Sequence, residues 1–306
     1  MKDLRSMTGC GTALVTPFTS DGGIDEPALK RLVEYQISHG IDFLVPCGST
    51  GEAATLSAEE HWRVVQIVVQ QAAGRVPVIA GAGGNNTQRV IELAKGCEQL
   101  GVDGLLSVSP YYNKPTPDGL VAHYRAIADA VALPIIVYNV PGRTGSNIEP
   151  NTLARLAGIA NIIGVKEASG NVLQIAEILN RLPHDFKVFS GDDALTLPIV
   201  ALGGVGVISV ASNEAPAEMT KLTRLCLEGR FEEARQLNRR LWALMQVNFI
   251  ESNPIPVKAA LSMMGLIEEH YRLPLVPLKP ENRERVRQVL LATGLLQATG
   301  QPSATG

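Results

Sequence analysis

The chain has 306 residues, 45% of them hydrophobic and 19% charged, which is enough apolar material for a large buried core. Its 27 Lys and Arg against 30 Asp and Glu give a formal net charge of -3, which argues against nucleic-acid binding because that needs a basic surface. No apolar run reaches the length of a membrane span, about 20 residues, and the first residues lack the pattern of a signal peptide. We therefore expect a cytoplasmic protein with no nucleic-acid or membrane partner.

The four cysteines and five histidines are scattered along the sequence. None of them has the spacing of a zinc site, a disulfide framework or a catalytic triad. We expect them to be structural, and we expect no metal.

Eight short apolar runs recur at regular intervals over the first 210 residues. They are mostly continuous rather than alternating, which is typical of parallel strands buried on both faces of a sheet. The predicted strands are residues 11–18, 43–48, 76–83, 104–110, 134–140, 162–169, 186–192 and 205–210. Amphipathic helical segments separate them, with starts at Ser57, Thr87 and Asn171.

Eight strands with intervening helices in about 230 residues favour an α/β fold of the (β/α)8 TIM-barrel type over an open, doubly wound sheet. An open sheet usually carries a dinucleotide fingerprint after its first strand, and residues 16–23 read TPFTSDGG instead.

Beyond Gly229 the strand pattern stops, and residues 231–252, 255–265 and 280–296 read as helices. We divide the chain into a barrel over residues 1–230 and a C-terminal helical region over residues 231–306, with a disordered tail after about residue 297. The helical region should pack on the barrel or on another subunit.

Polar side chains follow four of the predicted strands. In a TIM barrel the carboxyl ends of the strands carry the active site. The segments concerned are CGSTGE at 47–52, PYYN at 110–113, YNVPGRT at 138–144 and KEAS at 166–169. Four separate strand ends thus indicate one site.

Lys166 lies inside the apolar run IIGVKEAS, which should form barrel wall. Because burial disfavours the charged form, its pKa should fall and its amine should become nucleophilic near neutral pH. We interpret Lys166 as a Schiff-base lysine. The alternatives are a pair with Glu167 or another carboxylate, or exposure to solvent.

Hydroxyl groups and a cation lie at the other strand ends. Tyr138 should project toward the barrel mouth and could pass protons to and from a carbonyl substrate, in a relay completed by Ser49 and Tyr112; the alternative for each is packing. The turn GSTGE at 48–52 offers hydroxyls and backbone N–H groups that suit a carboxylate or phosphate. Arg143 could clamp a substrate carboxylate or form only a surface ion pair.

Some features are weaker signals. The glycine-rich segments 81–84 and 203–206 look like phosphate-binding loops, but neither has the Lys and Ser or Thr of a P-loop. Asp192 and Asp193 could be acids, but a helix N-cap explains them adequately.

These motifs together resemble the dihydrodipicolinate synthase family, within the superfamily of pyruvate-dependent class I aldolases that includes N-acetylneuraminate lyase. The resemblance runs from about Gly9 to Gly294. Its carriers are GSTGE at 48–52, SPYYNKP at 109–115, YNVPGRTG at 138–145, GVKEAS at 164–169, FSGDDALTLP at 189–198, GGVGVISV at 203–210 and NPIPVKAAL at 253–261. The arginine of PGRTG is specific to the synthases, because the lyases and sugar-acid aldolases usually carry another residue there.

The resemblance implies a lyase of lysine (diaminopimelate) biosynthesis that condenses pyruvate with L-aspartate-4-semialdehyde. Lys166 would form the Schiff base with pyruvate, and no other cofactor would be needed. Protons would pass through Tyr138, Ser49 and Tyr112, the last reaching in from a neighbouring subunit of a homotetramer built from two tight dimers.

The resemblance also implies the residues that bind substrate. Thr50 and the backbone around Ile208 would hold pyruvate, Arg143 would bind the carboxylate of the aldehyde, and Gly191 would lie with them. One relay position departs from the family pattern, because Ser49 stands where threonine is common and lacks the methyl group that restricts the rotamer.

A second departure concerns feedback inhibition by lysine. Family members that respond to lysine carry polar or acidic groups where this chain has Ala53, Ala58 and Arg89. The positions that do match the responsive members are His61, Asn85 and Tyr111. Because Arg89 would repel the ammonium group of lysine, we expect weak or absent inhibition.

Other functions stay open at this point. Another pyruvate-dependent aldolase would cleave N-acetylneuraminate or a 2-keto-3-deoxy sugar acid. Arg143 argues against this alternative, because it suits a small second carboxylate better than a polyol aldehyde. A phosphate-binding barrel isomerase would depend on the glycine-rich segment 203–206. A catalytically idle barrel would not need the polar residues at its strand ends.

Overall fold

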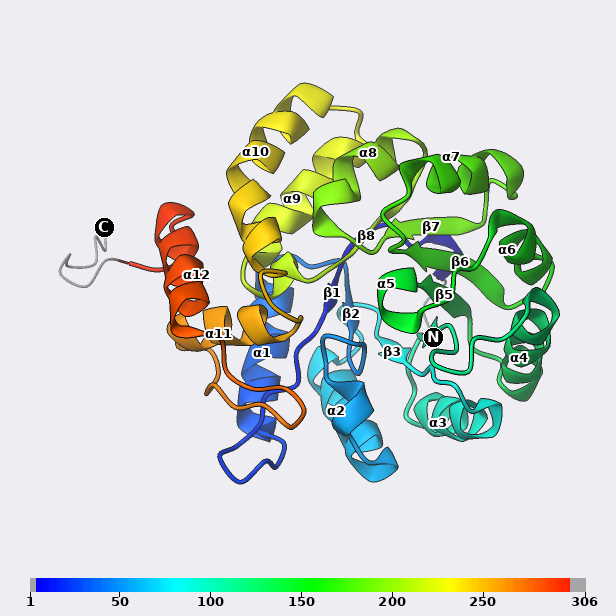
Figure 1. Ribbon diagram of the computed structural model, residues 1–306, viewed down its shortest axis with the longest axis horizontal. Coiled ribbons are helices and arrows are strands. Elements are labelled where there is room, and N and C mark those ends of the chain that lie inside the picture. The colour runs from blue at the N-terminus through cyan, green and yellow to red at the C-terminus, as the bar shows by residue number, and fades with distance from the viewer. Residues whose placement is uncertain (1–3, 298–306) are drawn as a thin grey trace.

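The computed structural model describes residues 4–297, so the predicted disordered tail lies outside the described residues. Eight parallel strands form a barrel at the centre of the molecule (Figure 1). They are β1 (Gly9–Ala13), β2 (Phe43–Val45), β3 (Ile79–Gly81), β4 (Gly104–Val108), β5 (Ile135–Asn139), β6 (Ile162–Glu167), β7 (Lys187–Ser190) and β8 (Gly206–Ser209). The strands pair in the order β2–β1–β8–β7–β6–β5–β4–β3, and a bridge between Leu44 and Val78 joins the two ends.

Helices surround this barrel, as Figure 1 shows. Those that follow strands are α1 (Glu26–Ser38), α2 (Ala58–Ala72), α3 (Thr87–Gln99), α4 (Pro117–Ala130), α5 (Pro141–Thr144), α6 (Pro150–Ala157), α7 (Val172–Arg181), α8 (Thr196–Ala201) and α9 (Pro216–Leu227). Three more complete the chain: α10 (Phe231–Val247), α11 (Ile255–Met263) and α12 (Pro280–Ala292). The predicted TIM barrel with C-terminal helices is confirmed.

All eight predicted strands are present, and each is shorter than the apolar run that predicted it. The first begins two residues early, at Gly9, and ends at Ala13 instead of Phe18. Leu14, Val15 and Phe18 are nevertheless buried. Burial and not pairing keeps these positions apolar, so hydrophobicity alone does not mark where the backbone leaves the sheet.

The start of α2 is fixed by the predicted capping box. The Ser57 hydroxyl accepts a hydrogen bond from the Glu60 amide at 3.2 Å, and the Glu60 carboxylate accepts one from the Ser57 amide at 2.9 Å. The box satisfies donors that a helix N-terminus otherwise leaves free. It also anchors the chain directly after the turn at residues 48–52.

Two buried apolar layers set which side chains reach the barrel interior. The interior cluster includes Phe43, Leu106, Tyr138, Phe189 and Ile208. The outer cluster lies between strands and helices, and Val137 and Val165 belong to it. Because successive strand residues point to opposite faces, the residues that follow these valines, Tyr138 and Lys166, point inward.

The C-terminal helices pack on the barrel of their own chain. Leu241 of α10, Ala260 of α11 and Val286 of α12 belong to the same buried cluster as the outer face of the strands. The domain boundary near residue 230 therefore stays a division made on the sequence pattern.

Within residues 4–297 no helix has the length and apolar character needed to cross a membrane. All four cysteines are free and buried.

Candidate active site

A cavity of about 150 Å³ lies at the carboxyl ends of the strands. Six predicted site residues line it, namely Ser49, Thr50, Tyr138, Arg143, Lys166 and Gly191. Its wall also includes Asp192, Val210, Phe249 and Asn253, which the sequence did not indicate as ligand contacts. The fold thus brings together side chains as far apart in the sequence as Ser49 and Asn253.

Lys166 is buried in this cavity, with 5% of its surface exposed. Its Nζ lies 4.4 Å from the centre of the Tyr138 ring. Burial lowers the pKa of Lys166 to about 8, Asp193 opposes that shift and Arg143 adds to it. An amine with this pKa has an appreciable neutral fraction near pH 7, which is the form that attacks a carbonyl.

Neither alternative reading of Lys166 holds. Its neighbour Glu167 faces the helices, where its carboxylate accepts hydrogen bonds from the Asn139 side-chain amide at 3.0 Å and from the Ser169 backbone amide at 2.7 Å. Lys166 forms no ion pair with any carboxylate of residues 4–297, and it is not exposed to solvent.

Tyr138 and Ser49 line the same cavity beside the lysine. The pKa of Tyr138 is raised, because burial outweighs the positive charge of Arg143 and the hydrogen bond with Ser49, which both lower it. Arg143 and Ser49 thus oppose part of the effect of burial on this phenol.

Asn253 connects two of the predicted binding residues. Its side-chain Nδ2 donates to the Thr50 hydroxyl at 3.0 Å, and its backbone carbonyl accepts from the Arg143 guanidinium at 3.1 Å. It lies in the connection between α10 and α11, so the C-terminal region takes part in the cavity. The sequence placed Asn253 only at the start of the motif NPIPVKAAL.

The two aspartates after β7 have different roles. Asp192 accepts a hydrogen bond from the Ala194 amide at 2.9 Å and caps a short 3₁₀ helix, as predicted. For Asp193 the cap interpretation does not apply to this helix, because its buried carboxylate accepts from the backbone amides of Val210 and Ala211 at 3.0 and 2.9 Å. It joins the ends of β7 and β8 and contributes a negative charge near Lys166.

Two predicted site residues do not line the cavity. Tyr112 is 90% exposed, with a left-handed backbone at φ 70°, and its side chain contributes nothing to the site within the single chain. Ile208 is fully buried in the barrel interior, and Val210 occupies the cavity wall beyond it.

The glycine-rich segments 81–84 and 203–206 allow close packing of strands. A Cβ on Gly81 would lie 2.1 Å from the carbonyl oxygen of Cys47, and a Cβ on Gly206 would lie 1.9 Å from that of Gly9. These approaches explain why glycine stands there without any phosphate ligand.

A second cavity of about 570 Å³ lies between the 48–58 segment and α3. It contains all six positions considered for lysine inhibition, namely Ala53, Ala58, His61, Asn85, Arg89 and Tyr111.

A (β/α)8 barrel with a buried, partly neutral lysine beside a tyrosine at its strand ends defines a class of barrel enzymes that act on carbonyl compounds. The comparisons with known proteins are more specific. The chain belongs to the dihydrodipicolinate synthetase family, whose model matches residues 6–293. This confirms the resemblance inferred from the motifs and makes the chain an enzyme of the lyase class.

Similar proteins match over nearly their whole length. The 4-hydroxy-tetrahydrodipicolinate synthase of Koribacter versatilis is 55% identical over 95% of this chain and 97% of its own. The crystal structure of dihydrodipicolinate synthase from Aquifex aeolicus has a TM-score of 0.94 at 46% identity, covering 95% of this chain and all of the other. The chloride-inhibited synthase of Acinetobacter baumannii, complexed with pyruvate, has a TM-score of 0.94 at 45% identity and covers 95% of this chain and 100% of its own.

Proposed function

We propose that the chain condenses pyruvate with L-aspartate-4-semialdehyde, the activity of a 4-hydroxy-tetrahydrodipicolinate synthase in lysine (diaminopimelate) biosynthesis. The observation that carries this proposal is the buried amine of Lys166, its pKa lowered to about 8, beside Tyr138 in the strand-end cavity. Relatives that align over nearly the full chain have this name, and the Acinetobacter baumannii relative is complexed with pyruvate.

The reaction begins when the neutral Lys166 amine attacks the keto carbon of pyruvate and water leaves as the imine forms. Loss of a proton from the pyruvate methyl group gives an enamine, because the protonated imine accepts the electron pair. The enamine carbon attacks the aldehyde carbon and forms the new carbon–carbon bond. The amino group of the aldehyde substrate then attacks the imine carbon, closes the ring and releases Lys166. The imine is the electron sink, so this sequence needs no metal or organic cofactor.

Tyr138 and Ser49 carry the protons in these steps, with Tyr112 supplied by a neighbouring subunit of a homotetramer. Their support in the single chain is the cavity that Tyr138 and Ser49 line together and the 90% exposure of Tyr112. We assign the cytoplasm as the location of this assembly.

Substrate binding follows from the remaining cavity residues. Thr50 and the backbone between Ile208 and Val210 hold the pyruvate carboxylate, and Arg143, exposed at the mouth, binds the carboxylate of the aldehyde. Gly191 leaves room beside the lysine, since a Cβ there would lie 3.2 Å from Lys166 Cε and 2.6 Å from Ala168 Cβ.

The test is product formation from pyruvate and L-aspartate-4-semialdehyde, followed through the downstream NADPH-dependent reductase. Lys166→Ala should abolish turnover because, among residues 4–297, no other lysine lines the cavity. Lys95→Ala, which removes an exposed lysine of α3, is the matched control and should leave the rate unchanged. A near-normal rate in Lys166→Ala would overturn the mechanism.

Borohydride trapping with pyruvate separates the competing functions. An adduct on Lys166 without turnover of this aldehyde would favour another pyruvate aldolase. No adduct, together with tight binding of a sugar phosphate, would favour an isomerase.

A further inference from the structure

A buried ion pair joins the C-terminal region to the turn that carries Ser49 and Thr50. Lys258 of α11 donates to the Glu52 carboxylate at 2.6 Å, and their side chains are 0% and 1% exposed. A buried pair of this kind is often no more stable than apolar residues of the same volume, because both charges lose their hydration. Stability is therefore a weak explanation for it, and the mechanism above does not use either charge.

The surroundings of the pair hold both partners in place. Lys258 Nζ lies 4.3 Å from the centre of the Phe18 ring, and the Arg272 guanidinium lies 4.4 Å from the same ring. The backbone amide of Arg272 donates to the second oxygen of Glu52 at 3.5 Å. The C-terminal region thus contacts both oxygens of this carboxylate.

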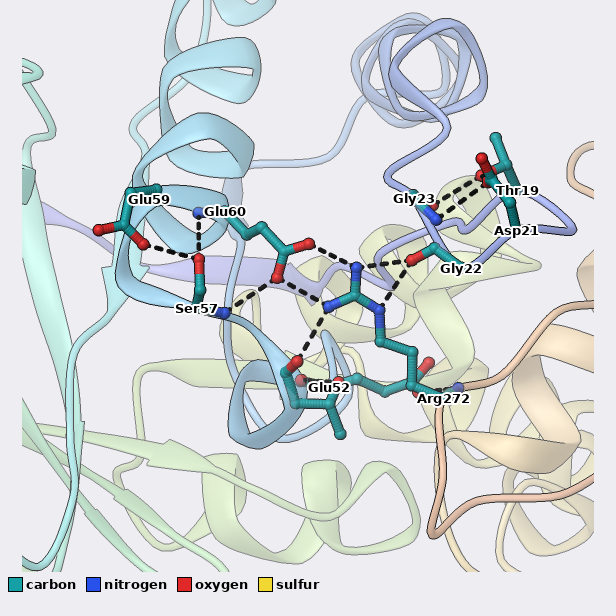
Figure 2. Close-up of polar contacts among 10 residues, drawn as sticks. Thr19, Asp21, Gly22, Gly23, Glu52, Ser57, Glu59, Glu60 and Arg272 are labelled. Atoms are coloured by element: carbon teal, nitrogen blue, oxygen red, sulfur yellow. Dashed lines mark hydrogen bonds and ion pairs between the residues drawn. The ribbon is translucent and has the colours of Figure 1, made fainter.

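The Arg272 side chain ties the same region to two further segments. Its guanidinium donates to the Gly22 carbonyl at 2.6 Å and to the Glu60 carboxylate at 2.6 Å (Figure 2). It also donates to the Thr55 carbonyl at 2.9 Å. Glu60 is also the residue whose carboxylate completes the capping box of Ser57 at the start of α2. The turn at residues 47–52 is therefore followed directly by a segment that is anchored to the C-terminal chain.

The turn itself needs such an anchor. Cys47 and Glu52, its first and last residues, have left-handed backbones with φ of 56° and 52°, a conformation that residues with a Cβ disfavour. Between them lie Ser49, which lines the cavity with Tyr138, and Thr50, which accepts from Asn253. A shift of Glu52 toward ordinary backbone angles would move both hydroxyls.

We propose that Glu52 is a positioning residue, whose bond to Lys258 holds the left-handed end of the 47–52 turn and thereby keeps the Ser49 hydroxyl against Tyr138. This inference rests on the proposed function, because it assigns Ser49 to the proton relay. Glu52 and Lys258 touch no reacting atom; they act through the turn.

The test is a double-mutant cycle between Glu52 and Ser49. Glu52→Gln should lower kcat at least about tenfold, since misplacement of a reacting group by about 1 Å can cost 10²-fold. In a Ser49→Ala background the same change should lower kcat by less than about twofold, because the hydroxyl that it positions is already absent. In Glu52→Gln, the fraction of chain trapped by borohydride at saturating pyruvate should equal that of the wild type. The reason is that Lys166, which forms the imine, lies on β6 and not on the 47–52 turn.

A matched control is Glu26→Gln. Glu26 forms an exposed ion pair with Arg63 at the same distance of 2.6 Å, and its loss should leave kcat unchanged. Where Glu52→Gln does not fold, the variant with both Glu52→Gln and Lys258→Met replaces the pair by neutral side chains and serves in the same cycle.

Equal losses of kcat from Glu52→Gln with and without Ser49 would overturn the positioning role. So would an unchanged kcat in Glu52→Gln. Absence of any pyruvate adduct in the wild-type enzyme would instead overturn the proposed function, so the two failures are distinguishable.

Discussion

Lys166 acquires its reactivity from burial at the end of β6. Its pKa falls from the ordinary 10.5 to about 8, so about a tenth of the amines are neutral at pH 7. The neutral fraction increases with pH up to the folded pKa, so the rate of imine formation should rise about tenfold per unit below pH 8 and level off above it. Borohydride trapping of pyruvate at short times, repeated across pH, measures this rate. An imine-formation rate that keeps rising up to about pH 10.5, the pKa of an ordinary lysine, would contradict this prediction.

A separate prediction concerns the hydroxyl group of Tyr138. Tyr138→Phe keeps the ring that lies against Lys166 but removes the hydroxyl that we assign to the proton relay. Loss of a proton-transfer group typically costs 10²-fold or more, so kcat should fall by about that factor. Steady-state kinetics give the value. The control is Tyr35→Phe, which removes a hydroxyl bonded to the Glu214 carbonyl, and neither of these residues lines the cavity. A loss below about tenfold would remove Tyr138 from the relay.

The residues that could be predicted from the sequence differ physically from those that could not. Lys166, Tyr138 and Ser49 interrupt or follow apolar runs, so the barrel rule alone places them at one rim. Asn253 and Asp193 reach the site through contacts between distant segments: Asn253 meets Thr50, 203 positions away, and Asp193 meets the end of β8. No local pattern contains such contacts.

At the scale of elements, apolar runs predicted every strand and the three C-terminal helices, but not how they end. The run 11–18 continues past β1 because Leu14, Val15 and Phe18 pack against helices. The segment that follows β2 is likewise shaped by α11, since the charge of Lys258 faces Glu52. Element type is thus decided locally, whereas the geometry of the turn after β2 depends on a contact with the distant helix α11.

The cavity between the 48–58 segment and α3 gives a prediction about inhibition. Arg89 lines it and carries a positive charge, and Ala53 and Ala58 offer no polar group to a ligand. Lysine should therefore inhibit weakly or not at all, because its ammonium groups meet a like charge. Initial rates across lysine concentrations measure this. Half-maximal inhibition at submillimolar lysine would contradict it, and Arg89→Glu should strengthen inhibition.

At the scale of the whole molecule, the exposed Tyr112 indicates that one chain alone does not complete the proposed proton relay. It is 90% exposed outside the cavity of its own subunit, so its proposed role requires a second copy. Lys166→Ala and Tyr112→Phe chains should then complement each other, because one site of a mixed dimer has both Lys166 and a partner's Tyr112. Random reassortment of the two inactive variants should restore about a quarter of wild-type activity, since about half of the dimers are mixed and each contains one complete site. The coupled assay after joint refolding measures it, with each variant refolded alone as the control. No gain over the separate variants would mean that Tyr112 does not act across an interface, and the tyrosine of the relay would have to come from within the chain.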